Sequence, residues 1–486
     1  MMKIGFNNDK YLAMQSQHIR ERIGEFDNKL YLEFGGKLFD DYHASRVLPG
    51  FQPDSKLRLL KELSDQAEIV IVISANDIVK NKMRGDLGIS YDDDVLRLRS
   101  AFQENGLYVG SVAITQYTGQ SSADLFKLRL EKMGIPVYLL HNIEGYPNNI
   151  SLIVSDDGYG KNDYIQTTRP LVVITAPGPG SGKMATCLSQ LYHEHKRGIS
   201  AGYAKFETFP IWNLPLKHPV NLAYEAATAD LNDLNMIDSF HLEAYGKTTV
   251  NYNRDIEIFP VLAAIFEKIY GESPYKSPTD MGVNMAGNCI SNDEVCREAS
   301  YQEIIRRYYT TQTNVLLGTS TENEVYKLEL LMKQAGITPT RRTVVNRVLE
   351  YREEINLPCA AIELPNGTII TGKQSNSLGA PSALLLNALK TLANVDPDED
   401  IISPDAVTPI QLLKTSYLGS STPELNLDET LIALSISASS NVSALEALKQ
   451  LPLLSSCQVH LSNMPNSIDR QVFQKLGMQM TADAKY

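Results

Sequence analysis

The stretch LVVITAPGPGSGKMAT, residues 171–186, places an apolar run, a glycine-rich turn and the start of a helical pattern in direct succession. This order is typical of an anion-binding loop. Glycines let backbone N–H groups turn toward a ligand, and a helix N-terminus carries partial positive charge. Lys183 adds a full charge that can reach phosphate oxygens. The stretch therefore predicts an α/β domain with a phosphate-loop-like strand-turn-helix.

The loop departs from the standard phosphate-loop pattern at two positions. Pro177 stands where that pattern has its first glycine, and Met184 stands where it has the Ser or Thr that binds magnesium. We therefore predict a phosphate site without standard Mg²⁺ coordination, the alternatives being a plain strand-to-helix connection or another catalytic use of Ser181 or Lys183. The predicted ligand-binding residues of the loop are Gly178, Gly180, Ser181, Gly182, Lys183 and Met184.

Apolar runs alternate with amphipathic helical patterns through the first 175 residues. Strands are expected over 29–34, 67–74, 107–115, 135–143, 151–155 and 171–175, and helices over 55–66, 94–106 and 122–134. Strands that are apolar almost throughout are typical of a parallel sheet covered on both faces. We predict a doubly wound, mostly parallel sheet that binds its ligand beyond the C-terminal ends of the strands.

Residues 200–290 are rich in aromatic residues, Asn, Asp and Pro, with little periodicity. Their apolar content is too high for disorder, and long irregular segments in compact domains are usually functional. We predict an ordered segment that folds over the sheet edge and supplies site residues. Buried networks and structural ion pairs are the alternative roles for these polar residues. The candidate ligand-binding residues here are Lys205, Trp212 and Arg254, and the candidate catalytic residues are Lys183, Asp255 and Asp280.

A second domain is predicted to follow. We place the boundary so that residues 1–325 form the α/β domain and residues 326–486 a C-terminal α/β or α+β domain. Helices are expected over 292–312, 321–336, 339–355 and 381–395, and a strand over 457–462. Asn366-Gly367 between two β-rich runs indicates a hairpin with a two-residue turn.

Composition excludes several classes of protein. The net charge of −12 disfavours broad duplex binding, which needs a basic surface, so no nucleic-acid partner is expected. The five cysteines are scattered without a CxxC pair, which argues against a disulfide framework or a zinc ribbon, and no metal site is predicted. No run approaches the roughly 18 apolar residues of a membrane span. We expect a cytoplasmic protein without a membrane partner, and leave open whether it forms a homo-oligomer.

The run at residues 170–231, together with NYNRDIEIFPV (251–261) and SPTDMGVNMAG (277–287), resembles uncharacterised protein family 0371, a bacterial family of unknown function. The resemblance extends along nearly the whole chain and implies a two-part protein divided near residue 325. Some members carry the label ATP-dependent peptidase. No nucleophile–base pair or zinc-ligand spacing in this sequence supports that label. The resemblance implies no catalytic residues.

The leading hypothesis is an enzyme that binds ATP, another nucleotide or a phosphorylated metabolite at residues 178–184 and transfers a phosphoryl or nucleotidyl group. Two alternatives stay open at this point. One is a binder of a phosphorylated cofactor that does not hydrolyse it. The other is a hydrolase or isomerase that uses the loop only to hold a substrate phosphate.

Overall fold

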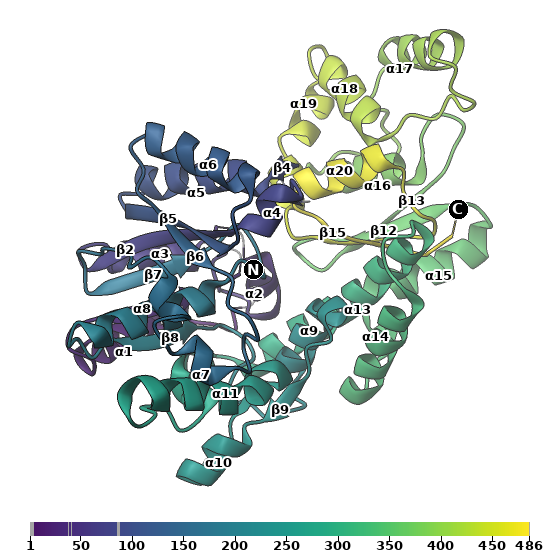
Figure 1. Cartoon of the computed structure of the whole chain (residues 1–486). Helices are drawn as coiled ribbons and strands as arrows, with labels where there is room; N and C mark the ends of the chain where they lie inside the picture. Colours follow the sequence, from purple (N-terminus) through teal and green to yellow (C-terminus); the bar gives the residue numbers. More distant parts are fainter. Residues whose placement is uncertain (1–3, 37, 40, 85–87, 486) are drawn as a thin grey trace. The chain divides into compact units, whose positions relative to one another are not determined.

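The computed structural model describes residues 4–36, 38–39, 41–84 and 88–485 (Figure 1). Within this part the chain forms two compact units. One contains residues 4–225 and 233–297, and the other contains residues 226–232 and 298–485. Each unit has its own sheet, so each is described by itself.

The first unit is built on a seven-stranded sheet with the order β11-β8-β1-β7-β2-β5-β6. All of its neighbouring strands are parallel. This arrangement confirms the predicted α/β class and parallel sheet. The strands are β1 (Leu30–Phe34), β2 (Ala67–Ser74), β5 (Tyr108–Tyr117), β6 (Val137–His141), β7 (Leu171–Thr175), β8 (Gly202–Phe206) and β11 (Gly282–Val283).

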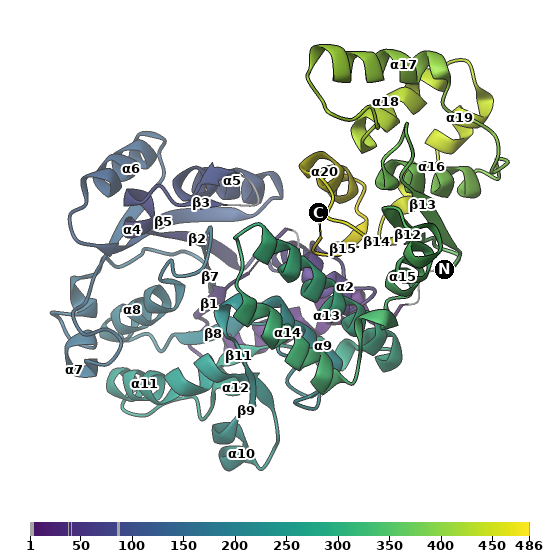
Figure 2. The ribbon, with the colours of Figure 1, turned by 90° about the vertical axis from the view of Figure 1, so that its right-hand side faces the viewer.

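Helices cover both faces of this sheet because its crossovers run in two directions. Right-handed crossovers that move in opposite directions along a parallel sheet place their helices on opposite faces. Figures 1 and 2 show α5 and α6 on one side of the sheet and α8 and α11 on the other. The main helices are α1 (Asn8–Gly24), α3 (Ser55–Glu62), α5 (Tyr91–Glu104), α6 (Ser121–Lys132), α8 (Lys183–Lys196) and α11 (Asn253–Tyr270).

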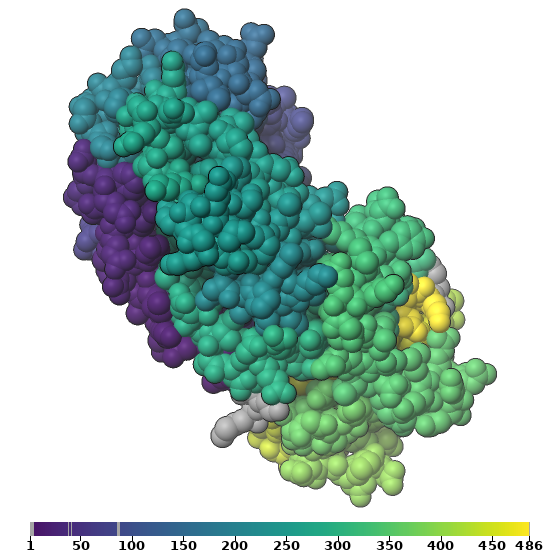
Figure 3. All heavy atoms as spheres, turned by 90° about the horizontal axis from the view of Figure 1, so that it is seen from below, coloured from purple at the N-terminus to yellow at the C-terminus, as the bar shows by residue number. Residues whose placement is uncertain are grey.

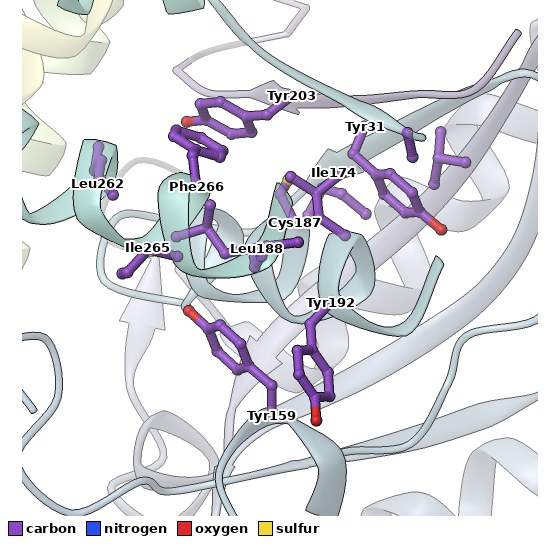
Figure 4. Close-up of a cluster of buried hydrophobic side chains, with 14 of the residues drawn as sticks. Tyr31, Tyr159, Ile174, Cys187, Leu188, Tyr192, Tyr203, Leu262, Ile265 and Phe266 are labelled. Atoms are coloured by element: carbon purple, nitrogen blue, oxygen red, sulfur yellow. The ribbon is translucent and has the colours of Figure 1, made fainter. Parts of the chain in front are cut away.

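A buried apolar cluster fastens α8 and α11 to the sheet (Figure 4). Tyr31 of β1 and Ile174 of β7 contribute from the strands, Leu188 from α8, and Leu262 and Phe266 from α11. Full burial of a large apolar side chain contributes about 1.5–3 kcal/mol. The cluster therefore holds the start of α8, and with it the glycine-rich loop, in a fixed position beyond β7.

The strand expected over 151–155 is wrong, because residues Ile150–Ile153 form the short helix α7. Asn149 caps this helix, and its side-chain oxygen accepts a hydrogen bond from the Leu152 amide at 3.3 Å. An Asn side chain that satisfies an amide of the first turn favours a helix start, whereas a five-residue apolar run fits either structure.

Residues 200–290 contain more regular structure than their composition predicts. The segment does form the sheet edge, through β8 and β11. Helix α1 contacts both of these strands, and Figure 3 shows its purple atoms beside the teal and green atoms of this segment. Its other elements are α9 (Pro219–Ala227), β9 (Asn235–Ile237), α10 (Ser239–Tyr245), β10 (Val250–Tyr252), α11 and α12 (Pro278–Met281).

The second unit contains a mixed sheet with the order β13-β12-β14-β15, in which only β14 and β15 are parallel. The expected hairpin joins β12 (Cys359–Glu363) to β13 (Ile369–Lys373), but the two-residue turn is wrong. Residues 365–367 form a three-residue loop. Leu364 donates to the Thr368 carbonyl, Gly367 donates to the Leu364 carbonyl, and Gly367 takes the left-handed φ of 85° that such loops require.

The remaining elements of the chain complete the two units. In the described part, no helix combines the length and the apolar character needed to cross a membrane. The remaining helices and strands are α2 (Tyr42–Val47), α4 (Ala75–Val79), β3 (Met83–Arg84), β4 (Ile89–Ser90), α13 (Asp293–Leu316), α14 (Glu322–Ala335), α15 (Thr343–Ile355), α16 (Ala380–Leu392), α17 (Pro404–Leu412), α18 (Leu427–Ser437), α19 (Val442–Leu448), β14 (Gln458–Leu461), α20 (Ser467–Lys475) and β15 (Gln479–Ala482).

Candidate functional site

The glycine-rich loop joins β7 to α8 at the C-terminal edge of the parallel sheet. Gly180 and Gly182 have φ angles of 75° and 85°, a region that glycine enters without steric cost. Gly182 also lies against β5, where a Cβ would come within 3.0 Å of the Thr115 hydroxyl. That hydroxyl donates to the Ser181 carbonyl at 2.7 Å. The hydrogen bond and the packing of Thr115, near the end of β5, therefore stabilise the curved conformation of the loop.

The loop presents unsatisfied backbone donors to a cavity of about 350 Å³. Gly180, Gly182, Lys183 and Met184 line this cavity, and no acceptor in the described part of the chain bonds to their amides. The first N–H groups of a helix have no acceptor within the helix. These four amides are therefore free to bind an anion that enters the cavity.

Lys183, the first residue of α8, lines the same cavity. Among the residues that the structure describes, none forms a hydrogen bond or an ion pair with its ammonium group. Its side chain passes Gly35, just beyond β1, where a Cβ would lie 3.9 Å from Lys183 Cε. The Lys183 ammonium group therefore has no described carboxylate within ion-pair distance and adds positive charge beside the free amides.

The cavity lies beyond the C-terminal ends of four strands, as the parallel sheet predicts. Its walls combine the loop with residues that the sequence did not single out. These are Glu33 of β1, Thr115 and Gln116 of β5, Leu140 and His141 of β6, the following Asn142, Ile143 and Tyr146, then Tyr159 and Asn162, and Ala185 and Thr186 of α8.

Glu33 places a carboxylate in the cavity that also holds Lys183. Its Oε2 accepts a hydrogen bond from the Tyr203 hydroxyl at 2.8 Å, and no described group donates to its Oε1. A carboxylate held on one oxygen in this way can accept a hydrogen bond from a ligand on the other.

The backbone of β5 is distorted where it meets the cavity. Gln116 has a φ of 52°, and the register between β5 and β6 shifts between Ile114 and Tyr117. The Gln116 side-chain oxygen accepts hydrogen bonds from Ser74 and Asn76, which hold the distorted residue. Left-handed non-glycine residues and bulges gather at functional sites, where surrounding contacts maintain them.

The loop lacks the Ser or Thr that usually binds magnesium directly after the lysine. Met184 occupies the position of the usual hydroxyl residue, and the nearby Thr186 hydroxyl donates to the Gly182 carbonyl at 2.9 Å. Within residues 4–485, apart from the few that are not described, no cluster of three His, Cys, Asp or Glu residues could hold a metal ion.

Two predicted loop residues shape the loop and do not line the cavity. The Ser181 side chain is fully buried, and its hydroxyl donates to the Gly178 carbonyl at 2.9 Å. Gly178 packs on Tyr91, since a Cβ there would lie 2.2 Å from the Tyr91 hydroxyl. Gly180, Gly182, Lys183 and Met184 thus lie together in one wall of the cavity, as expected for residues that contact a ligand. Gly178 and Ser181 lie behind this wall and stabilise the loop.

Lys205 and Asp255 come together, but outside the walls of the cavity. Lys205 of β8 forms ion pairs with Asp255 of α11 and, at 2.9 Å, with Glu207. The Lys205 ammonium also lies 5.1 Å from the centre of the Tyr252 ring. The alternative of a buried network therefore describes Lys205, and Glu207 is a further member of that network.

The other candidates from residues 200–290 also lie outside the cavity. Arg254 forms a two-pronged pair with Asp233, with distances of 2.7 and 2.9 Å. Trp212 packs against Gly282 of β11. Asp280 accepts hydrogen bonds from the Tyr245 hydroxyl and the Lys276 amide, both at 2.9 Å. The structure does not bring these three residues to Lys183.

The buried Glu207 makes stability depend on pH. Burial, opposed by Lys205 and reinforced by Asp255, raises the pKa of Glu207 from 4.5 to about 8. A carboxyl with a raised pKa in the folded state binds a proton that the unfolded chain releases. Its contribution to stability is therefore present below pH 4.5 and is lost as the pH rises to about 8.

We expect Glu207→Gln to remove this part of the pH dependence, because the amide cannot ionise. Urea unfolding at several pH values between 5 and 9 measures the effect. Glu104→Gln, a change at an exposed position of α5, is the matched control and should preserve the wild-type slope. An unchanged slope in Glu207→Gln would show that Glu207 has an ordinary pKa in the folded protein.

Comparisons with known proteins agree on a family for the whole chain. The family model described as domain of unknown function DUF1846, N-terminal, matches residues 4–336, and the model for the C-terminal domain of the same family matches residues 340–486. The chain is 57% identical to UPF0371 protein str1377 of Streptococcus thermophilus (strain CNRZ 1066) and 56% identical to a UPF0371 protein of Streptococcus sanguinis (strain SK36). Each alignment covers 100% of this chain and 98% of the relative. These matches confirm the resemblance found in the sequence.

Proposed function

Since the chain belongs to the DUF1846 family, whose descriptions name no activity, we propose its function from the loop cavity: it binds the phosphate group of a small metabolite without magnesium. The observation that carries the proposal is the set of four free amides beside an unpaired lysine in one cavity. The N-terminus of α8 adds the helix dipole at the same point.

The geometry favours binding over phosphoryl transfer with a loop-bound magnesium ion. Transfer from a nucleoside triphosphate ordinarily uses a metal ion that bridges the phosphates and neutralises their charge. Met184 supplies no oxygen at the position of the usual hydroxyl ligand, and the Thr186 hydroxyl is oriented toward the Gly182 carbonyl. Asp255 and Asp280, the carboxylates predicted to act in catalysis, lie outside the cavity walls. We therefore place the phosphorylated-ligand binder ahead of the transferase.

Ribose 5-phosphate and ribose form a matched pair of ligands that tests the need for phosphate. We expect ribose 5-phosphate to stabilise the protein in the presence of EDTA and ribose to have no effect. At a concentration of 100 times the Kd, the ligand adds about 2.7 kcal/mol to the apparent free energy of unfolding. Thermal unfolding with isothermal titration calorimetry measures both. Equal effects of the two sugars, or an effect only with added magnesium, would contradict the proposal.

A further inference from the structure

A second wall of the cavity is apolar and aromatic, unlike the wall of amides and lysine that the loop forms. Leu140, Ile143, Tyr146 and Tyr159 supply apolar and aromatic surface, and His141 adds another ring. All except Tyr159 lie in β6 or in the turn that follows it. One cavity therefore joins an anion site to an aromatic surface, which is more than a bare phosphate requires.

Tyr146 is suited to pack against a planar group. The residue lies at the cavity wall and is 38% exposed, which leaves room for a ligand to approach its ring. Rings of this kind bind bases of any sequence by stacking, because every base has a π face. The neighbouring Asn142 side chain forms no hydrogen bond in the described part of the chain, so its amide can pair with the edge of a heterocycle.

The two tyrosines also offer hydrogen-bond donors. Although part of Tyr146 is exposed, its hydroxyl lies among protein atoms, and this burial, followed by the nearby Glu33 carboxylate, raises the pKa of Tyr146 to about 12. Burial, followed by the adjoining Tyr146, raises the pKa of Tyr159 well above its ordinary value. Both phenols therefore keep their protons at neutral pH. Tyr159 also lines the cavity, and its buried hydroxyl lies beside the Tyr146 hydroxyl, so the two phenols can bond to each other and leave one proton for a polar ligand atom.

The charges that line the cavity limit how many phosphate groups the ligand can carry. Among the described residues of its wall, Lys183 is the one lysine or arginine, and the Glu33 carboxylate lines the cavity too. A triphosphate would bring several negative charges toward that carboxylate without a magnesium ion to screen them. A monophosphate matches one lysine and a helix N-terminus, and the free Glu33 oxygen can accept a hydrogen bond from a sugar hydroxyl.

We infer that the ligand is a nucleoside 5′-monophosphate, whose phosphate meets the loop, whose ribose meets Glu33 and whose base meets the wall of Tyr146, Tyr159 and Asn142. This inference rests on the proposed phosphate site and adds the class of molecule that carries the phosphate. The aromatic wall then binds the base, and the site selects nucleotides over sugar phosphates.

Titration calorimetry in EDTA with AMP, UMP, adenosine and ribose 5-phosphate tests the inference. We expect AMP or UMP to bind at least tenfold more tightly than ribose 5-phosphate, because the base adds stacking. Adenosine should bind more weakly than AMP. Ribose 5-phosphate binding as tightly as both nucleotides would overturn the nucleoside inference and leave the phosphate site standing. Failure of every phosphorylated probe to bind would overturn both.

Tyr146→Ala is expected to weaken binding of the preferred nucleotide about tenfold and to change ribose 5-phosphate binding less than twofold. Tyr146→Phe keeps the ring and should keep most of the affinity. Tyr42→Ala, which removes an exposed ring outside the cavity walls, should alter neither ligand. Equal losses for nucleotide and sugar phosphate in Tyr146→Ala would overturn the role of the aromatic wall, and circular dichroism verifies that each variant is folded.

Discussion

Lys183→Met is expected to weaken the binding of AMP and of ribose 5-phosphate about 10- to 100-fold, the largest functional effect that we predict. The substitution keeps the apolar stem and removes the charge. Hydrogen bonds to charged groups contribute about 1.5–3 kcal/mol, and each 1.4 kcal/mol is a tenfold change in Kd. Titration calorimetry in EDTA measures the loss for each ligand.

Stability provides the second measurement for Lys183→Met. The Lys183 ammonium has no partner in the described structure, so we expect the free energy of unfolding to stay within about 0.5 kcal/mol of wild type. Lys196→Met is the matched control, because Lys196 ends the same helix but pairs with Asp156 outside the cavity walls. Unchanged affinity in Lys183→Met, or an equal loss in Lys196→Met, would refute the phosphate site.

Lys205→Met is expected to destabilise the first unit by about 3–5 kcal/mol, the largest effect on stability. It leaves the partly buried Asp255 carboxylate without its cation, beside a Glu207 whose raised pKa keeps it mostly protonated at pH 7, and removing one partner of a buried ion pair is far costlier than removing a surface charge. Urea-induced unfolding at pH 7 measures the change. The Lys196→Met variant should lose less than about 1 kcal/mol, because its ion pair is exposed.

A double substitution separates the ion-pair effect from lost packing. If uncompensated charge causes the instability, Asp255→Asn in the Lys205→Met background should restore part of the lost free energy, since the amide carries no charge. The coupling energy follows from the cycle of the two single variants and the double variant. Strictly additive losses would show that Lys205 acts through its aliphatic stem alone.

The two predictions probe separate groups of charges at the same edge of the sheet. Glu33 of β1 and Lys205 of β8 are register partners, and the pKa of Lys205 is raised, against burial, by Asp255 first, then by Glu207 and Glu33. Glu33 lines the cavity, whereas Lys205 is satisfied by its own carboxylates. The Lys205 network therefore has a structural role beside the site, and Lys183 has the ligand-binding role within it.

Much of the first unit could be predicted because its signals are local. β2 and β7 coincide with the expected strands, and α8 begins at Lys183 as the loop pattern predicts. Such elements depend on apolar runs, on glycines that allow positive φ and on helix caps, all of which lie within a few residues. The 151–155 run was predicted wrongly because it is too short for periodicity to distinguish a strand from a capped helical turn.

By itself the sequence determined the parallel α/β class, the family, and a loop whose glycines and lysine can meet an anion. Only the tertiary structure decided which of the predicted polar residues face that loop. Strand order brings β1, β5 and β6 to its side and so adds Glu33, Asn142 and Tyr146, while it gives Lys205 and Arg254 carboxylate partners elsewhere. The physical reason is that short-range patterns set the local backbone, whereas a cavity is formed by segments far apart in the chain, whose neighbours depend on the packing of the whole sheet.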